Sequence, residues 1–258
     1  MILLLDAGNS RLKWGCYAGG ELAVGDPVAY AGSGLEANLE RALGAIASPT
    51  RVLLCSVAAT AIQRRLTRWL RNRWHAPLAG VVPGRRGCGV QNAYPQPGTL
   101  GADRWAALVG ARAGGAGATC IVDAGTAVTV DLLTADGLHA GGLIVPGLEL
   151  ARGGLDRRTG RIASTAGADG PVRSLRLARN TRDAVRTGTL YQLVALLDRV
   201  VDDLAAAAGA PPRGLLTGGD AATLLPLLRT PFEHRPHLVL EGLAELARKR
   251  CNQQPVTD

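Results

Sequence analysis

Two short segments of the chain each place an aspartate, a glycine and a small polar residue directly after an apolar run. The first is ILLLDAGNS at residues 2–10, and the second is CIVDAGT at residues 120–126. A glycine after a strand allows a tight turn in which backbone N–H groups can approach an anion closely. A carboxylate repels phosphate unless a metal ion lies between them. We therefore predict two phosphate-binding loops, in which Asp6 and Asp123 act through a metal ion or orient water bound to one.

Each loop also has a purely structural interpretation, because Asp, Gly and Asn are common turn formers. The repetition of the pattern after two buried strands favours phosphate binding over two plain hairpins.

A third segment, LLTGGDAATLL at residues 215–225, places Gly218 and Gly219 between an apolar run and a helical pattern. Adjacent glycines allow the base or ribose of a nucleotide to lie against the backbone. The alternative is a strand-to-helix turn that needs glycine for its geometry alone.

The elements that would position these loops alternate between strand and helix, which is typical of layered α/β proteins. Strands are predicted at 2–5, 12–17, 52–57, 120–123, 127–133, 142–145 and 214–217. Helices are predicted at 35–47, 59–74, 102–113, 181–207, 220–229 and 239–250. The Gly/Ala-rich stretch at 111–120 separates the two similar halves. We therefore expect one domain at 1–115 and a second at 116–258.

Composition indicates a globular protein, since 47% of the 258 residues are hydrophobic and 19% are charged. No apolar run reaches the roughly 18 residues that a membrane helix needs, and the N-terminus lacks a basic leader. A cytoplasmic protein without a membrane partner is expected.

The five cysteines form no C-x-x-C pair, so we expect buried thiols without a disulfide or a zinc site. His234 and His237 lack a neighbouring acidic or cysteine ligand, which argues against a metal site there.

The formal charge of +8 comes almost wholly from arginine. The helix predicted at 59–74 gathers five arginines opposite an apolar stripe. Such a helix could bind nucleic acid, but charge runs on helices are usually solvated faces. We favour a solvated face and expect no nucleic-acid partner.

The segment NAYPQPGTLGADRWAALVGA (92–111) carries the most specific pattern in the chain. With DAGTAVTVD (123–131), GGLIVPGL (141–148), RNTRDAVRTG (179–188) and TGGDA (217–221), it resembles the type III pantothenate kinases. That family belongs to the actin-like ATPase and sugar kinase superfamily. The resemblance implies an α/β fold of two duplicated ribonuclease-H-like domains, with ATP in the cleft between them.

The resemblance also implies an activity: the ATP-dependent phosphorylation of pantothenate, the first step of coenzyme A biosynthesis. Asp103 would be the general base that takes the proton of the pantothenate hydroxyl. The implied cofactors are Mg²⁺ with ATP, held by Asp6, and a monovalent cation (K⁺ or NH4⁺) at Asp123. A homodimer is implied as well. The implied ATP-binding residues are Asp6, Gly8, Asn9, Ser10, Lys13, Thr126, Gly218 and Gly219, and the implied pantothenate-binding residues are Tyr94, Gly101, Ala102, Asp103, Arg104 and Thr181.

Three alternatives stay open from the sequence. Asp103 could merely interact with the dipole of a helix N-terminus while Arg104 is solvated. The substrate could be another small hydroxyl compound. The chain could also be a non-catalytic regulator, because part of the family was first named as an accessory factor for virulence-gene expression. The presence of Asp103 and of the phosphate-loop glycines argues for the kinase.

Overall fold

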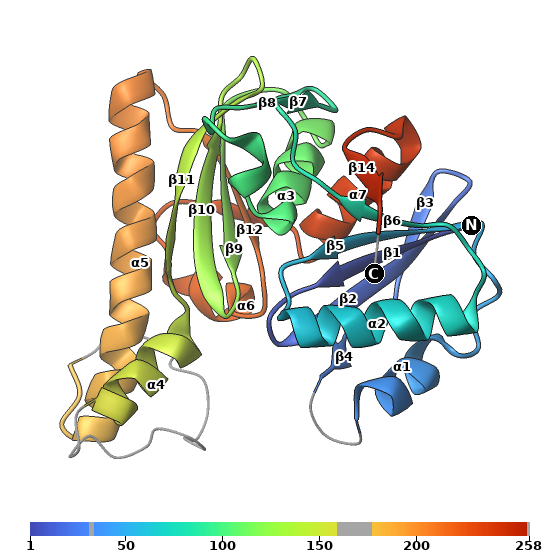
Figure 1. Cartoon of the computed structure of the whole chain (residues 1–258). Helices are drawn as coiled ribbons and strands as arrows, with labels where there is room; N and C mark the ends of the chain where they lie inside the picture. The colour runs from blue at the N-terminus through green and yellow to red at the C-terminus, as the bar shows by residue number, and fades with distance from the viewer. Residues whose placement is uncertain (31–33, 159–176, 257–258) are drawn as a thin grey trace. The chain divides into compact units, whose positions relative to one another are not determined.

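A computed structural model describes residues 1–30, 34–158 and 177–256 (Figure 1). The chain forms two compact units. The first contains Met1–Ala116, Gly137–Ala140 and His237–Asp258, and the second contains Gly117–Asp136 and Gly141–Pro236. The sequence predicts a division at residues 115 and 116 that leaves 237–258 in the second domain. The C-terminal segment instead belongs to the first unit, because its helix packs against a helix of that unit.

The first unit is built on a mixed sheet with the strand order β14-β6-β5-β1-β2-β3. The two central strands, β1 (Ile2–Ala7) and β5 (Arg51–Ser56), are parallel, whereas β2 (Arg11–Ala18) runs antiparallel to β1. β3 (Glu21–Val24), β4 (Val28–Ala29), β6 (Leu78–Val81) and β14 (Gln253–Pro255) complete the sheet, with β4 paired to β2. Three consecutive fully buried leucines in β1 indicate that both faces of the sheet are covered.

Helices cover both faces of this sheet. Leucines of α1 (Leu35–Leu43) and α2 (Thr60–Arg73) share one apolar cluster with Leu3 and Leu5 of β1. The helices α3 (Ala102–Ala113) and α7 (Leu238–Lys249) pack against each other, and both contact the central strands. Gly242 makes this approach possible, because a Cβ at that position would collide with the backbone of Ala106. α7 therefore fixes the C-terminal segment on the first unit.

The second unit repeats the strand arrangement of the first. β9 (Thr119–Ala124) pairs antiparallel with β10 (Ala127–Leu133) and parallel with β12 (Arg213–Thr217). With β11 (Leu138–Pro146) and β13 (Phe232–His234) the order is β13-β12-β9-β10-β11. It matches β6-β5-β1-β2-β3 strand for strand. The duplication predicted from the two Asp-Ala-Gly segments is confirmed at the level of topology.

The described part of the second unit has four helical segments: α4 (Leu148–Arg158), α5 (Thr181–Ala208), α6 (Ala221–Leu224) and η2 (Leu225–Leu227). The apolar stripe of α5, with Leu190, Leu193 and Leu197, packs in one cluster with Val122 and Val128 of the sheet. Proline at position 226 accompanies the change from α6 to the 3₁₀ turn η2, so the helix predicted at 220–229 is shorter than expected.

One expectation about the cysteines is wrong. Cys88 and Cys251 form a disulfide bond, although the sequence favours free thiols throughout. The bond joins the hairpin of β7 (Arg86–Gly87) and β8 (Val90–Asn92) to the segment that follows α7. The two cysteines are 163 residues apart, so no local spacing signals the pair. Cys16, Cys55 and Cys120 are free, as expected.

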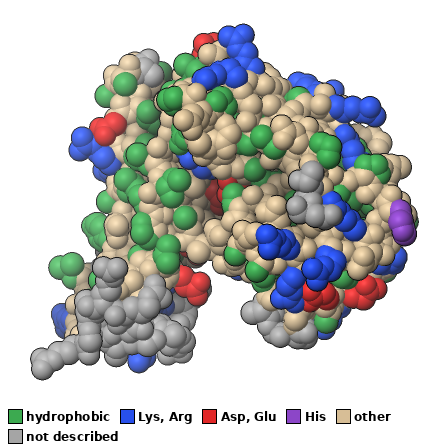
Figure 2. Space-filling view, viewed as in Figure 1, with side chains coloured by type: hydrophobic (Ala, Val, Ile, Leu, Met, Phe, Trp, Pro, Cys, Tyr) green, Lys and Arg blue, Asp and Glu red, His purple; other side chains and the backbone are tan. Residues whose placement is uncertain are grey.

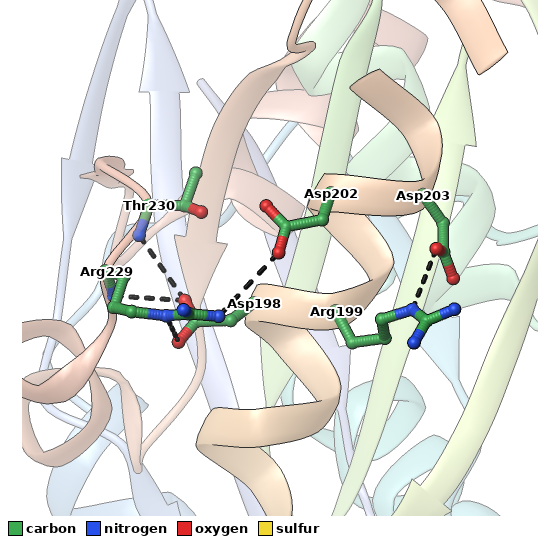
Figure 3. A network of polar contacts seen from close by, with 6 residues as sticks. All are labelled: Asp198, Arg199, Asp202, Asp203, Arg229 and Thr230. Atoms are coloured by element: carbon green, nitrogen blue, oxygen red, sulfur yellow. Dashed lines mark hydrogen bonds and ion pairs between the residues drawn. The ribbon is translucent and has the colours of Figure 1, made fainter. Parts of the chain in front are cut away.

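A buried carboxylate on α5 fixes the loop between η2 and β13 (Figure 3). One oxygen of Asp198 accepts hydrogen bonds from the backbone N–H groups of Arg229 (3.0 Å) and Thr230 (3.3 Å). The other oxygen accepts from Nε of Arg229 at 3.2 Å. The Asp198 side chain is only 5% exposed, so the two N–H groups depend on it for a partner.

We predict that Asp198→Ala lowers the free energy of unfolding by about 2 kcal/mol, because two backbone N–H groups lose a charged acceptor. Urea denaturation followed by circular dichroism measures the change. The matched control is Asp203→Ala on the same helix, where the ion pair with Arg199 is exposed on both sides. That control should change stability by less than about 1 kcal/mol. Equal effects of the two substitutions would contradict the structural role of Asp198.

Candidate functional site

The first Asp-Ala-Gly loop lies at the carboxyl end of β1 in the first unit. Asp6 is 6% exposed and stands opposite Lys13 of β2 in the strand register. The N–H of Gly8 donates to the carbonyl of Arg11 at 3.2 Å, which closes a tight turn and leaves Asn9 and Ser10 exposed. The loop thus presents polar groups and one lysine at a strand end, as a phosphate-binding turn requires.

The charges of Asp6 and Asp103 both act on one buried thiol in this unit. Cys55 of β5 is fully buried and pairs with Asp6 in the register of the two central strands. Burial raises the pKa of the Cys55 thiol well above its usual value, and the charges of Asp6 and Asp103 raise it further. Both carboxylates must be close to Cys55 to act on it. The structure therefore brings together the aspartate of the first loop and the predicted base.

Asp103 occupies the first turn of α3, which begins after Gly101. Its Oδ1 accepts a hydrogen bond from the N–H of Arg104 at 2.7 Å. Ala102 is the first residue of the helix. A 3₁₀ turn, η1 (Pro97–Thr99), immediately precedes this segment and ends the loop that carries Tyr94. Gly101, Ala102 and Asp103 are thus held at one helix N-terminus, where a carboxylate is favoured by the helix dipole.

Arg104 is not solvated. It is 6% exposed, and its Nη1 donates to the hydroxyl of Tyr94 at 3.0 Å. The guanidinium also lies over the Tyr94 ring, with 5.7 Å between Cζ and the ring centroid. A charge this buried is retained only where it is paired or hydrogen-bonded. The interpretation of Arg104 as a plain surface residue is therefore wrong, and Tyr94 and Arg104 form a unit beside Asp103.

Three further residues hold Tyr94, and the sequence assigned no role to any of them. His139, fully buried in β11, stacks on the Tyr94 ring with 5.7 Å between centroids and 25° between planes. Asn92 is 1% exposed and accepts from the N–H of Tyr94 at 3.0 Å. Arg85 donates to the backbone of the same loop. Asn92 belongs to the quoted motif, but His139 lies 45 positions beyond Tyr94 and only the fold brings it close.

The second unit brings its two predicted ATP loops together. Asp123 of β9 pairs with Thr217 of β12 in the strand register, so the loops at 123–126 and 217–220 meet at the same edge of the sheet. Gly218 has φ = +97°, and a Cβ there would collide with the backbone of Ala124. The N–H of Asp220 donates to the carbonyl of Ala124 at 2.9 Å. Glycine at 218 is thus required for this contact.

The remaining predicted site residues of the second unit lie at turns and helix ends. Gly219 follows the strained position at 218, and no atom would obstruct a Cβ on it. The carbonyl of Thr126 accepts from the N–H of Gly147 at 3.0 Å, which ties the loop to the start of α4. Thr181 begins α5 and is exposed, while Asn180 caps the helix by accepting from the N–H of Asp183 at 2.9 Å.

The donor set suits a metal ion that is bound together with a phosphate. Within residues 1–30, 34–158 and 177–256, no three His, Cys, Asp or Glu side chains gather into a metal-binding group. Mg²⁺ in kinases is typically held by one or two carboxylates plus substrate phosphates and water. A largely buried Asp6 next to a phosphate-type turn fits that coordination. A surface cavity of 520 Å³ between residues 46–50 and 73–77 contains none of the predicted site residues.

Comparison with known proteins agrees with this arrangement. The family model of type III pantothenate kinase matches residues 2–203, which is well over half of the chain. The chain belongs to the type III pantothenate kinase family. Curated relatives of that name include proteins of Nitrosococcus oceani (40% identical, covering 100% of this chain and 98% of the relative) and Halorhodospira halophila (41% identical, 98% and 100%). As a member of the pantothenate kinase family, the chain is an ATP-dependent kinase that works with a divalent metal ion.

Solved structures confirm the fold of this pantothenate kinase family member. A Campylobacter jejuni protein described as a putative Baf family transcriptional activator superposes with a TM-score of 0.60 over 97% of this chain and 99% of that one, at 19% identity. A putative 2-dehydro-3-deoxygalactonokinase of Sinorhizobium meliloti reaches 0.57 over 97% and 99%, at 17% identity. The actin-like ATPase and sugar kinase fold predicted from the sequence is therefore confirmed. No helix within the described ranges is long and apolar enough to cross a membrane.

Proposed function

We propose that this chain transfers the γ-phosphoryl group of ATP to the primary hydroxyl of pantothenate, giving 4′-phosphopantothenate for coenzyme A biosynthesis. The observation that carries the proposal is the placement of Asp103 at the start of α3, next to the buried Arg104 and its hydrogen bond to Tyr94. Membership of the type III pantothenate kinase family supports the same substrate. Pantothenate has a carboxylate, which a cationic side chain can bind, and a primary hydroxyl, which a general base such as Asp103 can deprotonate.

In the proposed reaction, Asp103 accepts the proton of the pantothenate hydroxyl as its oxygen attacks the γ-phosphorus. The bond between the γ-phosphorus and its bridging oxygen breaks, and ADP leaves. A positioned base typically contributes 10²–10⁴-fold to such a step. Arg104 donates to the Tyr94 oxygen, so the Tyr94 hydroxyl can donate its own proton to the substrate. Gly101 and Ala102 would line the same pantothenate pocket.

The loop from Asp6 to Lys13 is the proposed site for the ATP phosphates in the first unit. Gly8, Asn9 and Ser10 would supply donors to phosphate oxygens, and Lys13 would offset their negative charge. Asp6 would hold Mg²⁺, which would supply charge neutralisation on the transferring phosphoryl group. The low exposure of Asp6 supports this role, because a buried carboxylate interacts strongly with a nearby cation.

In the second unit, Thr126 and the Gly218–Gly219 turn are the proposed contacts for the remainder of ATP. Asp123 is the proposed ligand of a monovalent cation, K⁺ or NH4⁺. The shared sheet edge of the two loops supports these assignments, because ligands gather at the carboxyl ends of strands in α/β sheets. Thr181 is proposed to contact pantothenate from the second unit or from a partner subunit.

A homodimer is part of the proposal. Several large apolar side chains of the second unit are exposed, and Figure 2 shows hydrophobic side chains along the α5 side of that unit. They are Leu143 and Ile144 on β11, Leu150 and Leu155 on α4, and Tyr191 on α5. Exposed apolar patches of this kind mark interaction surfaces.

A cytoplasmic location stays a prediction, and the Cys88–Cys251 bond is unusual for a reducing compartment.

Release of ADP from Mg-ATP, measured with and without pantothenate, tests the proposed function. We expect turnover that depends on pantothenate and that is stimulated when K⁺ replaces Na⁺. Other small hydroxyl compounds serve as controls for substrate class. Turnover with one of these compounds but not with pantothenate would overturn the substrate assignment, whereas equal rates in K⁺ and Na⁺ would overturn only the monovalent site.

A further inference from the structure

The loop that carries Tyr94 is held by an arginine that lies outside the recognised motif. Nη1 of Arg85 donates to the carbonyl oxygen of Tyr94 at 2.9 Å, and Nη2 donates to that of Pro95 at 2.9 Å. A longer contact of 3.4 Å joins Nη1 to the carbonyl of Asn92. The guanidinium therefore holds two successive carbonyls in a fork that only an arginine side chain can provide.

Backbone and side-chain contacts reinforce this clamp. The carbonyl of Arg85 accepts from the N–H of Asn92 at 2.9 Å. The amide of Asn92 then bridges the loop, since it accepts from the N–H of Tyr94 and donates to the carbonyl of Pro97 at 3.2 Å. The main chain is thus held on both sides of Tyr94, and the ring contacts both Arg104 and His139.

We propose that Arg85 is a positioning residue that fixes Tyr94 for pantothenate binding. The inference rests on the proposed function, in which Tyr94 lines the pantothenate pocket. Arg85 is exposed, and within the part of the chain that the structure describes its guanidinium donates to the carbonyls of this loop. Its loss should therefore loosen the loop without disturbing the phosphate turn. If the loop adopts the binding conformation only part of the time, the apparent affinity for pantothenate falls in proportion to the fraction of time spent in that conformation.

The first test is Arg85→Ala, assayed for KM of pantothenate, KM of ATP and kcat. We expect KM for pantothenate to rise about tenfold, which corresponds to the loss of the net contribution of one or two hydrogen bonds. KM for ATP should stay within twofold. The matched control is Arg86→Ala, which removes the same charge from the adjacent exposed position. A rise of the same size in Arg86→Ala would overturn the inference.

A conservative variant separates positioning from simple attraction of the pantothenate carboxylate. Arg85→Lys keeps the positive charge but cannot offer two parallel donors in a fixed plane. It should raise KM for pantothenate nearly as much as Arg85→Ala does. Full activity of Arg85→Lys would show that charge alone suffices and would overturn the positioning role. The lysine variant also serves if Arg85→Ala does not fold.

A double-mutant cycle with Tyr94→Ala separates two claims: that Arg85 acts through Tyr94, and that Tyr94 lines the pantothenate pocket. If Arg85 acts through Tyr94, then Arg85→Ala should have little further effect in the Tyr94→Ala background. Equal factors in both backgrounds would overturn the inference while leaving the pocket intact. An unchanged KM for pantothenate in Tyr94→Ala alone would instead overturn the proposed pocket, and the inference would be overturned with it.

Discussion

Replacing Asp103 by asparagine should lower kcat by about 10²–10⁴-fold, the usual contribution of a positioned general base. Asparagine has nearly the same shape but cannot accept the proton of the pantothenate hydroxyl. Its amide oxygen can still accept from the N–H of Arg104, so the start of α3 should remain intact. The loss should therefore appear in turnover and not in folding.

The measurement pairs ADP release under saturating substrates with ATP binding by isothermal titration calorimetry. Binding of ATP should stay within about threefold of wild type, because Asp103 is not proposed to contact the nucleotide. Asp26→Asn is the control, since Asp26 is an exposed carboxylate in the same unit. If Asp103→Asn turned over at a rate near that of wild type, Asp103 could not be the base.

The part of the fold that could be predicted comes from local patterns. The helix at 102–113 was predicted with the bounds that the structure has, because its apolar periodicity and its glycine boundaries lie within a few residues. The strands that lead into Asp6 and Asp123 are continuous apolar runs, which signal burial on both faces. The candidate residues at these strand ends could be located for the same reason.

The elements that could not be predicted depend on distant contacts. β6 and β8 are short strands that pair with β14 and β11 far along the chain, and β13 has only three residues. α4 contains two adjacent glycines that argue against a helix. α7 returns to the first unit because Gly242 permits a close approach to α3. The contact of His139 with Tyr94 arises in the same way, since β11 pairs with β8 in parallel.

Asp6→Asn should have the second large effect, a loss of about 10²–10³-fold in kcat/KM for Mg-ATP. The magnitude is that expected when one group that stabilises transition-state charge is removed. Asp6 and Asp123 occupy equivalent positions in the duplicated sheets, yet different cations are proposed for them. Asp6→Asn should therefore raise the Mg²⁺ concentration needed for half-maximal activity, whereas Asp123→Asn should not.

Titration of activity against Mg²⁺ at fixed K⁺, and against K⁺ at fixed Mg²⁺, separates the two aspartates. Asp123→Asn should abolish the stimulation by K⁺ and leave the Mg²⁺ midpoint unchanged. Asp103→Asn serves as the control for both titrations, because it should lower the rate without moving either midpoint. Should Asp6→Asn shift the K⁺ dependence and not that of Mg²⁺, the assignment of the two cations to the duplicated loops would have to be reversed.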